Sequence, residues 1–159
     1  MFEEGQALSL HELIALDMGI EYERLPFKVY FTLPLAFKSM AHIKGENPCE
    51  CNILNILGIL GNGGMSICGI GYEEEGLVFG NILRDNIKGV WEDNPTLTSL
   101  RNGIPSGLKG VCGMCIFKGL CLGYCRANAY TIDKDLLAPY WLCQKAYNEG
   151  SFPKTRLLL

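Results

Sequence analysis

The stretch Cys112-Gly-Met-Cys115-Ile-Phe-Lys-Gly-Leu-Cys121-Leu-Gly-Tyr-Cys125 places four cysteines in fourteen residues, with the spacing C-x2-C-x5-C-x3-C. A short C-x2-C turn lets two thiolates reach one metal centre, and two more sulfurs follow too soon for an intervening domain. The interleaved glycines permit the unusual backbone angles of a chain that wraps a metal. The stretch therefore predicts a metal centre, around which the rest of the chain is interpreted.

Four further cysteines lie outside this stretch: Cys49, Cys51 and Cys68 upstream, and Cys143 downstream. Eight thiolates would make two sites of four, a count that suits zinc as well as iron–sulfur clusters. Zinc ribbons separate two C-x2-C pairs by about 15–20 residues, whereas here single cysteines follow one such pair. The spacing favours iron–sulfur, with zinc as the second alternative and disulfides as the third.

Composition narrows the class of protein. The chain has 159 residues, of which 48% are hydrophobic and 19% charged, values typical of one globular domain with a core. Its net charge of −3 gives no reason to expect a nucleic-acid partner. The start MFEEGQ is acidic where a secretory signal is basic, and the longest apolar run, Ile53 to Leu60, is too short to cross a membrane. These features predict a cytoplasmic protein with reduced cysteines.

The first third of the chain predicts a helix, a strand and a short helix. Ser9 and Glu12 form the S-x-x-E pattern of a capping box, and apolar residues follow at near-helical spacing until Gly19 or a turn beyond it. Residues 27–33 alternate apolar and polar side chains over much of their length, as a half-buried strand does. Residues 35–43 are expected to form a short helix.

A β-hairpin is predicted next. Asn62-Gly63 is the strongest hairpin signal in the chain, and it separates an outgoing strand, Ile53 to Leu60, from a return strand, Met65 to Gly71, that carries Cys68. The two cysteines before the outgoing strand are two positions apart, so in extended chain they share a face. The hairpin would then bring three sulfurs together.

The remainder reads as short elements between irregular loops. The predicted elements are a strand at Val78–Asn81 and helices at Arg84–Trp91, Thr96–Asn102, Cys121–Tyr130 and Pro139–Gly150, the last carrying Cys143. The tail, residues 151–159, shows no clear structure. The expected fold class is α+β: a small β-hairpin followed by short helices and cysteine-rich loops wrapped around two metal clusters.

The cysteine pattern resembles that of the SPASM domain, the C-terminal auxiliary-cluster domain of many radical S-adenosylmethionine enzymes. That pattern is C-x(9–15)-G-x4-C, then C-x2-C-x5-C-x3-C, then a final C. Cys51, Gly63 and Cys68 fit its first part, the stretch that begins at Cys112 fits its second, and Cys143 is its final cysteine. The text CRANAY over residues 125–130 is similar to the peptide-maturase branch of the family.

The resemblance implies a fold division, ligands and cofactors. Residues 1–45 look like the end of a radical S-adenosylmethionine barrel, residues 46–150 like the auxiliary domain, and residues 151–159 are a tail. The resemblance implies two [4Fe-4S] clusters, the first held by Cys49, Cys51, Cys68 and Cys125, and the second by Cys112, Cys115, Cys121 and Cys143. The short spacing of Cys49 and Cys51 leaves a second alternative, in which one is idle and an iron stays open.

The functional expectation follows from the resemblance and from one departure. The chain has no C-x3-C-x2-C motif, so alone it should not cleave S-adenosylmethionine. The implied role is an accessory domain for electron transfer or substrate engagement during modification of a ribosomal peptide. Its partners would be a radical S-adenosylmethionine barrel, in the same or a separate chain, and a precursor peptide. A stand-alone two-cluster electron carrier and a zinc-binding interaction module are the alternatives. Arg126 and Lys118 are expected to be surface charges or cluster counter-charges.

Overall fold

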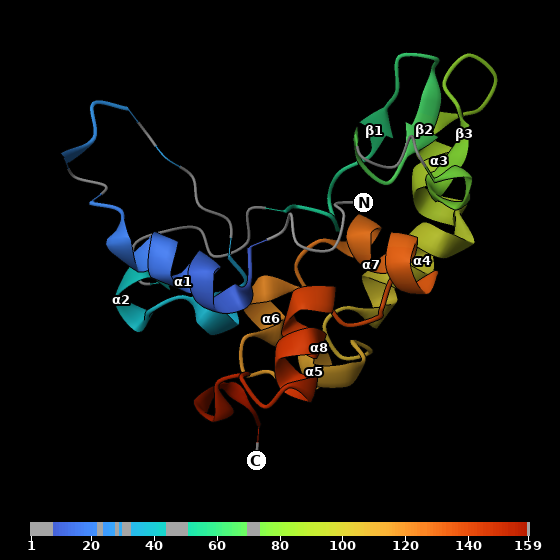
Figure 1. Ribbon diagram of the computed structural model, residues 1–159. Helices are drawn as coiled ribbons and strands as arrows, with labels where there is room; N and C mark the ends of the chain where they lie inside the picture. The colour runs from blue at the N-terminus through green and yellow to red at the C-terminus, as the bar shows by residue number, and fades with distance from the viewer. Residues whose placement is uncertain are drawn as a thin grey trace.

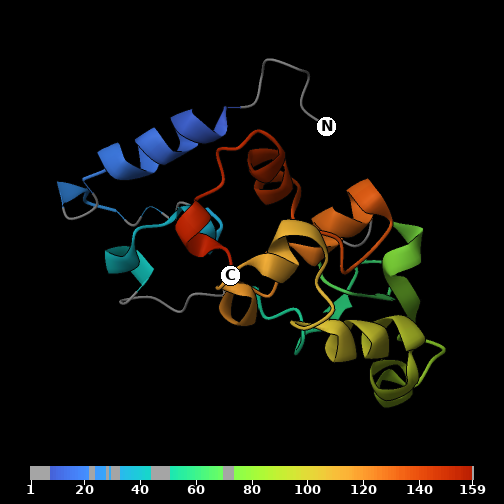
Figure 2. The ribbon, with the colours of Figure 1, turned by 90° about the horizontal axis from the view of Figure 1, so that it is seen from below.

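The computed structural model describes residues 8–21, 24–27, 29, 33–43, 51–69 and 74–158, without the side chains of residues 41 and 42. It confirms the α+β class: a three-stranded antiparallel sheet in the order β1-β2-β3 precedes a series of short helices. The sheet and α3 lie at one end of the molecule and α1 and α2 at the other, with α5, α6 and α8 between them (Figure 1). The view from below shows the same order (Figure 2).

The N-terminal helix α1 covers Leu10–Gly19 and has the predicted capping box. The amide of Glu12 donates to Ser9 Oγ at 3.3 Å, and the amide of Ser9 donates to Glu12 Oε2 at 2.8 Å. Two orphan N–H groups of the first turn are thereby satisfied. The local signal was therefore sufficient to place this helix.

The predictions that follow α1 have mixed outcomes. Of the strand expected over residues 27–33, only 27, 29 and 33 are described, and they are not in a strand; the rest lies outside the described residues. The helix expected over residues 35–43 is divided into a 3-10 turn, η2 (Leu35–Phe37), and α2 (Met40–Ile43). The extended backbone of Lys38 ends the first piece, and the carbonyl of Ser39 starts the second by accepting from the Ile43 amide at 3.2 Å.

The predicted hairpin is present, but its strands are shorter than expected. Strand β1 covers Gly58–Ile59 and β2 covers Gly64–Ser66, and they pair antiparallel across the Asn62-Gly63 turn. Gly63 has φ +82°, a conformation that glycine adopts without strain. Strand β3 covers Val78–Asn81, as predicted, and pairs antiparallel with the other edge of β2.

Asparagines explain why the outgoing strand does not begin at Ile53. The Asn55 amide donates to the Asn52 carbonyl at 2.9 Å, and the two side chains bond to each other at 2.9 Å. Such local bonds compete with strand pairing and favour a turn. On the return side, Cys68 follows β2 instead of lying on it, and residues 70–73 are outside the described part of the chain.

Helices α3 (Ile87–Asp93) and α4 (Pro95–Gly103) confirm the two helices predicted after the sheet. Asn94 lies between them, and its side-chain oxygen accepts from the amides of Thr96 at 3.0 Å and Leu97 at 3.2 Å. Pro95 occupies the first helical turn, where no N–H bond is lost. Leu97 and Leu100 of α4 are buried in the core.

The cysteine-rich part contains four short helices: α5 (Gly110–Met114), α6 (Lys118–Cys121), α7 (Arg126–Asp133) and α8 (Trp141–Asn148). The helix predicted from Cys121 to Tyr130 is wrong. Leu122, Gly123 and Tyr124 have φ values of +52°, +76° and +62°, and this left-handed linker separates the end of α6 from the start of α7. Cys121 therefore ends α6, whereas Cys125 caps the start of α7, and the two cysteines do not share one helical face.

The C-terminal tail is ordered, contrary to the prediction. It contains a 3-10 turn, η5 (Lys154–Arg156), and then pairs with the end of α5. The Ile116 amide donates to the Arg156 carbonyl at 2.8 Å, and the Leu158 amide donates to the Met114 carbonyl at 2.7 Å. In the ranges that the structure describes, no helix is both long enough and apolar enough to cross a membrane.

Candidate metal centre

Four cysteines line a single pocket of about 310 Å³, counting its open mouth. They are Cys112 of α5, Cys115 directly after it, Cys121 at the end of α6 and Cys143 of α8. These are the four residues predicted to hold the second cluster. The other lining residues are Pro34, Ala36, Val111, Phe117, Lys118, Gly123 and Phe152. The structure thus brings Cys143 to the C-x2-C turn, and whether the four ligate one cluster remains a prediction.

Packing of α5 against α8 brings two of these cysteines together. The Val111 amide, in the first turn of α5, donates to Gln144 Oε1 on α8 at 3.1 Å. On α8 the buried residues are Leu142, Cys143 and Ala146, so the cysteine lies on the face turned to the core. The spacing of apolar residues along α8 turns this face to the core, and the sulfur of Cys143 is thereby brought into the pocket.

Backbone N–H groups point at the sulfur atoms. The amides of Tyr140, Phe117 and Asn128 donate at 3.4 Å to the sulfurs of Cys112, Cys115 and Cys125, respectively. The Tyr124 amide donates to the Cys121 carbonyl at 2.9 Å, and the backbone groups of Leu35 and Tyr124 favour the Cys121 thiolate, which lowers its pKa against the effect of burial. Hydrogen bonds of this kind favour the thiolate, and around iron–sulfur clusters they tune the reduction potential. Pro34 and Ala36 line the same pocket, so η2 forms part of its wall.

The four thiols of the pocket differ in acidity. A hydrogen bond from Cys143 lowers the pKa of Cys112 to about 7, and the same bond, with burial, raises the pKa of Cys143. Burial raises the pKa of Cys121 to about 11 and also raises that of Cys115. A metal centre that takes all four as thiolates must therefore displace protons as it binds.

A zinc ion and an iron–sulfur cluster need different arrangements of the four sulfur atoms. A structural zinc site needs four sulfurs about 2.3 Å from one point. Among the described residues, no three Cys, His, Asp or Glu side chains are close enough to hold one metal ion. A [4Fe-4S] cluster gives each thiolate its own iron and so tolerates a wider ring of sulfurs. Four cysteines that line one pocket, with amides directed at the sulfurs of Cys112 and Cys115, are a donor set that fits such a cluster.

The cysteines predicted to hold the first cluster do not line the pocket of the other four. Cys51, Cys68 and Cys125 are half-buried and pack against the core, while Cys49 lies outside the described residues. A Cβ on Gly58 would lie 2.8 Å from the Cys68 carbonyl carbon, so the hairpin does return Cys68 against β1. In the described chain these three are not close enough to hold a single ion. Their ligation of a first cluster stays a prediction.

Arg126 is the residue of this region whose place the sequence did not reveal. Its side chain is 0% exposed, so the expectation of a surface charge is wrong, while a counter-charge role is untested. The guanidinium donates to the carbonyls of Leu136 at 3.0 Å and Ala138 at 2.6 Å, and to that of Gly123. The only signal in the sequence was its position directly after a cluster cysteine.

Comparison with known proteins gives one partial match. The chain is 41% identical over 58 residues to an AdoMet-dependent heme synthase of Methanosarcina barkeri. The match covers 36% of this chain and 16% of that protein. It relates the chain distantly to an AdoMet-dependent enzyme. The chain thus spans a small part of the length of this relative. No family model matches the sequence, and no solved structure matches it.

Proposed function

We propose that this chain is an auxiliary iron–sulfur domain that works with a radical S-adenosylmethionine barrel. The observation that carries the proposal is the pocket shared by Cys112, Cys115, Cys121 and Cys143, with backbone amides directed at its sulfurs. The partial match to an AdoMet-dependent enzyme supports the same system. The lack of a C-x3-C-x2-C motif assigns S-adenosylmethionine cleavage to the barrel.

The proposed cofactors are two [4Fe-4S] clusters with crossed ligands. Cys112, Cys115, Cys121 and Cys143 would hold the pocket cluster, and Cys49, Cys51, Cys68 and Cys125 the hairpin cluster. Bound clusters would supply one-electron transfer. The protein's own contribution is the pocket, in which Cys112, Cys115 and Cys143 are buried, and the amides that hold the sulfurs in position.

Two substrate classes follow from two different observations. The CRANAY text at residues 125–130 supports a ribosomal precursor peptide, through the family resemblance. The relative's name, a heme synthase, supports a tetrapyrrole instead. A peptide is expected to change in mass only when this chain, a barrel protein and S-adenosylmethionine are present together. A tetrapyrrole substrate would change its absorption spectrum under the same conditions, and the two assays distinguish the classes.

Anaerobic reconstitution tests the cofactor assignment directly. The wild-type chain, incubated with iron and sulfide and then desalted, is expected to hold about eight irons and eight acid-labile sulfides and to be brown. A colourless protein that binds zinc in preference, without acid-labile sulfide, would reject the proposal. A reconstituted protein that no barrel requires for turnover would instead favour the stand-alone electron carrier.

A further inference from the structure

Arg126 carries a positive charge into the interior and, in the part of the chain that the structure describes, forms no ion pair. It is the first residue of α7 and is 0% exposed. Its described hydrogen bonds all go to neutral backbone carbonyls, those of Gly123, Leu136 and Ala138. Its buried Nε has no hydrogen-bond partner in the described chain, and none of the ion pairs found there includes it. A buried charge is costly unless an opposite charge lies nearby.

The guanidinium lies directly behind the wall of the cysteine pocket. Gly123 lines that pocket, and a Cβ built on it would be 2.6 Å from Arg126 Cζ. No side chain fits between the pocket wall and the charge. Arg126 also directly follows Cys125, the one cysteine of the stretch that does not line the pocket.

The same placement is visible in the electrostatics. Burial lowers the pKa of Arg126, and the negative charges of Cys112, Cys121, Cys125 and Cys143 act in the opposite direction. The charge of Arg126 also contributes to lowering the pKa of Asp135, but the Asp135 carboxylate is paired with Lys109 Nζ at 2.5 Å. When these cysteines are ionised as metal ligands, their thiolates would supply negative charge next to Arg126.

We propose that Arg126 is the buried counter-charge of the cluster held in the cysteine pocket, and that it raises the reduction potential of that cluster. The inference rests on the proposed function, since it requires a cluster at the site. One-electron reduction adds one negative charge to the cluster, and a fixed positive charge in a low-dielectric interior stabilises the reduced state more than the oxidised state. The carbonyls of Gly123, Leu136 and Ala138 hold the guanidinium in place but do not neutralise it.

Three variants separate the charge from its contacts. Arg126→Gln removes the charge and keeps an amide donor, whereas Arg126→Lys keeps the charge and removes the planar fork. Lys145→Gln is the matched control: it removes a positive charge two residues from Cys143, but from a side chain that is 62% exposed. Solvent screens that charge, so its removal should have little effect.

The measurement is a dithionite titration of each reconstituted protein, followed by electron paramagnetic resonance. For Arg126→Gln the reduction equilibrium constant of the pocket cluster is expected to fall at least about tenfold, which is 59 mV for one electron. Arg126→Lys and Lys145→Gln are expected to stay within about threefold of wild type. A filled Arg126→Gln protein with the wild-type potential overturns the proposal, and so does an Arg126→Lys protein that shifts as far as Arg126→Gln.

Iron content and circular dichroism decide the remaining outcomes. If Arg126→Gln folds but holds no pocket cluster while Arg126→Lys holds it, the charge is required for loading, which supports the proposal. If Arg126→Lys also loses the cluster, or if the cluster-free Arg126→Gln protein unfolds, the side chain acts as a structural clamp and the proposal is overturned. A wild-type chain that binds no iron–sulfur cluster rejects the proposed function itself, a result distinct from either of these.

Discussion

Cys143 on α8 and Cys112 on α5 line the same pocket, and the interaction between their thiols lowers the pKa of Cys112 to about 7. The contact joins the first cysteine of the C-x2-C turn to the last cysteine of the chain. Cys125, although much closer in sequence, does not line their pocket. The grouping of sulfurs therefore follows the packing of helices and not the order of cysteines along the chain.

Single-cysteine variants test the crossed assignment. Cys143→Ala is expected to remove the pocket cluster and lower the iron content of the reconstituted protein from about eight to about four per chain. Cys125→Ala should lower it by a similar amount but leave the pocket cluster in place. Mössbauer spectra of the two variants should therefore show different remaining clusters. Loss of both clusters, or retention of both, in Cys125→Ala would contradict the crossing.

The sequence predicted those features that depend on neighbouring residues. The capping box of Ser9 and Glu12 and the turn at Asn62-Gly63 are each closed by bonds within a few residues, so their patterns are sufficient. The four cysteines that line the pocket could also be named in advance, because all belong to the pattern of the resemblance, while their ligation of a cluster stays a prediction.

Features that depend on distant packing were not predictable in the same way. The left-handed backbone of Leu122 and Tyr124 breaks the expected helix, and neither residue type signals a positive φ. The burial of Arg126 depends on carbonyls of the loop before α8, and the order of the tail depends on pairing with α5. No local pattern records these contacts.

Gly123 is expected to tolerate no side chain. Gly123→Ala places a Cβ at φ +76° and 2.6 Å from Arg126 Cζ, whose guanidinium is held by carbonyls and cannot withdraw. The expected loss in the free energy of unfolding is at least about 2 kcal/mol, from the left-handed conformation and the overlap together. Urea denaturation of the metal-free protein measures it.

Gly119→Ala is the matched control for that substitution. Gly119 lies in α6, and a Cβ built on it meets no atom within 4 Å. Alanine favours helix over glycine by up to about 1 kcal/mol, so this variant should be as stable as wild type or slightly more stable. Equal destabilisation of the two variants would show that the close contact at Gly123 is unimportant.

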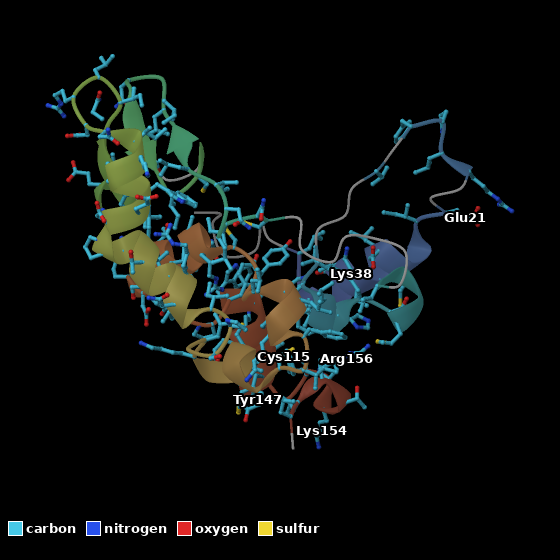
Figure 3. All side chains as sticks on the ribbon, turned by 180° about the vertical axis from the view of Figure 1, so that it is seen from behind. Glu21, Lys38, Cys115, Tyr147, Lys154 and Arg156 are labelled. Carbon is cyan, nitrogen blue, oxygen red and sulfur yellow. The ribbon has the colours of Figure 1, made fainter. Side chains whose placement is uncertain are left out.

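Arg156 is expected to secure the tail over the cysteine pocket. Its guanidinium lies 5.1 Å from the ring centroid of Phe117, a pocket residue, and donates to the Lys38 carbonyl at 3.4 Å. Figure 3 shows Arg156 beside Cys115 and Lys38. Arg156→Ala should lower the free energy of unfolding by about 1–2 kcal/mol and speed the loss of iron to a chelator. Lys154→Ala, an exposed residue of the same turn, should do neither, and equal rates of iron loss in both variants would refute this role.

Asp135 gives the metal-free protein a pH-dependent contribution to stability. Hydrogen bonds from Lys109 Nζ at 2.5 Å and from the Leu137 amide at 2.9 Å lower the pKa of Asp135 below its ordinary value of 3.8. A carboxylate with a lowered pKa stabilises the fold fully above its unfolded pKa, and this contribution is lost as the pH falls through the folded pKa.

Asp135→Asn should therefore cost about 0.5–1 kcal/mol at neutral pH, a small value because the Lys109 side chain is 63% exposed and the ion pair is partly screened. Urea midpoints of wild type and variant, measured from pH 7 downward, should differ by a constant amount until about pH 4 and converge below it. A difference that persists at pH 2 would show that the effect does not come from the charge of the carboxylate. Lys145→Gln removes an exposed lysine charge whose distance to Glu149 is 4.0 Å, so its smaller effect provides the comparison.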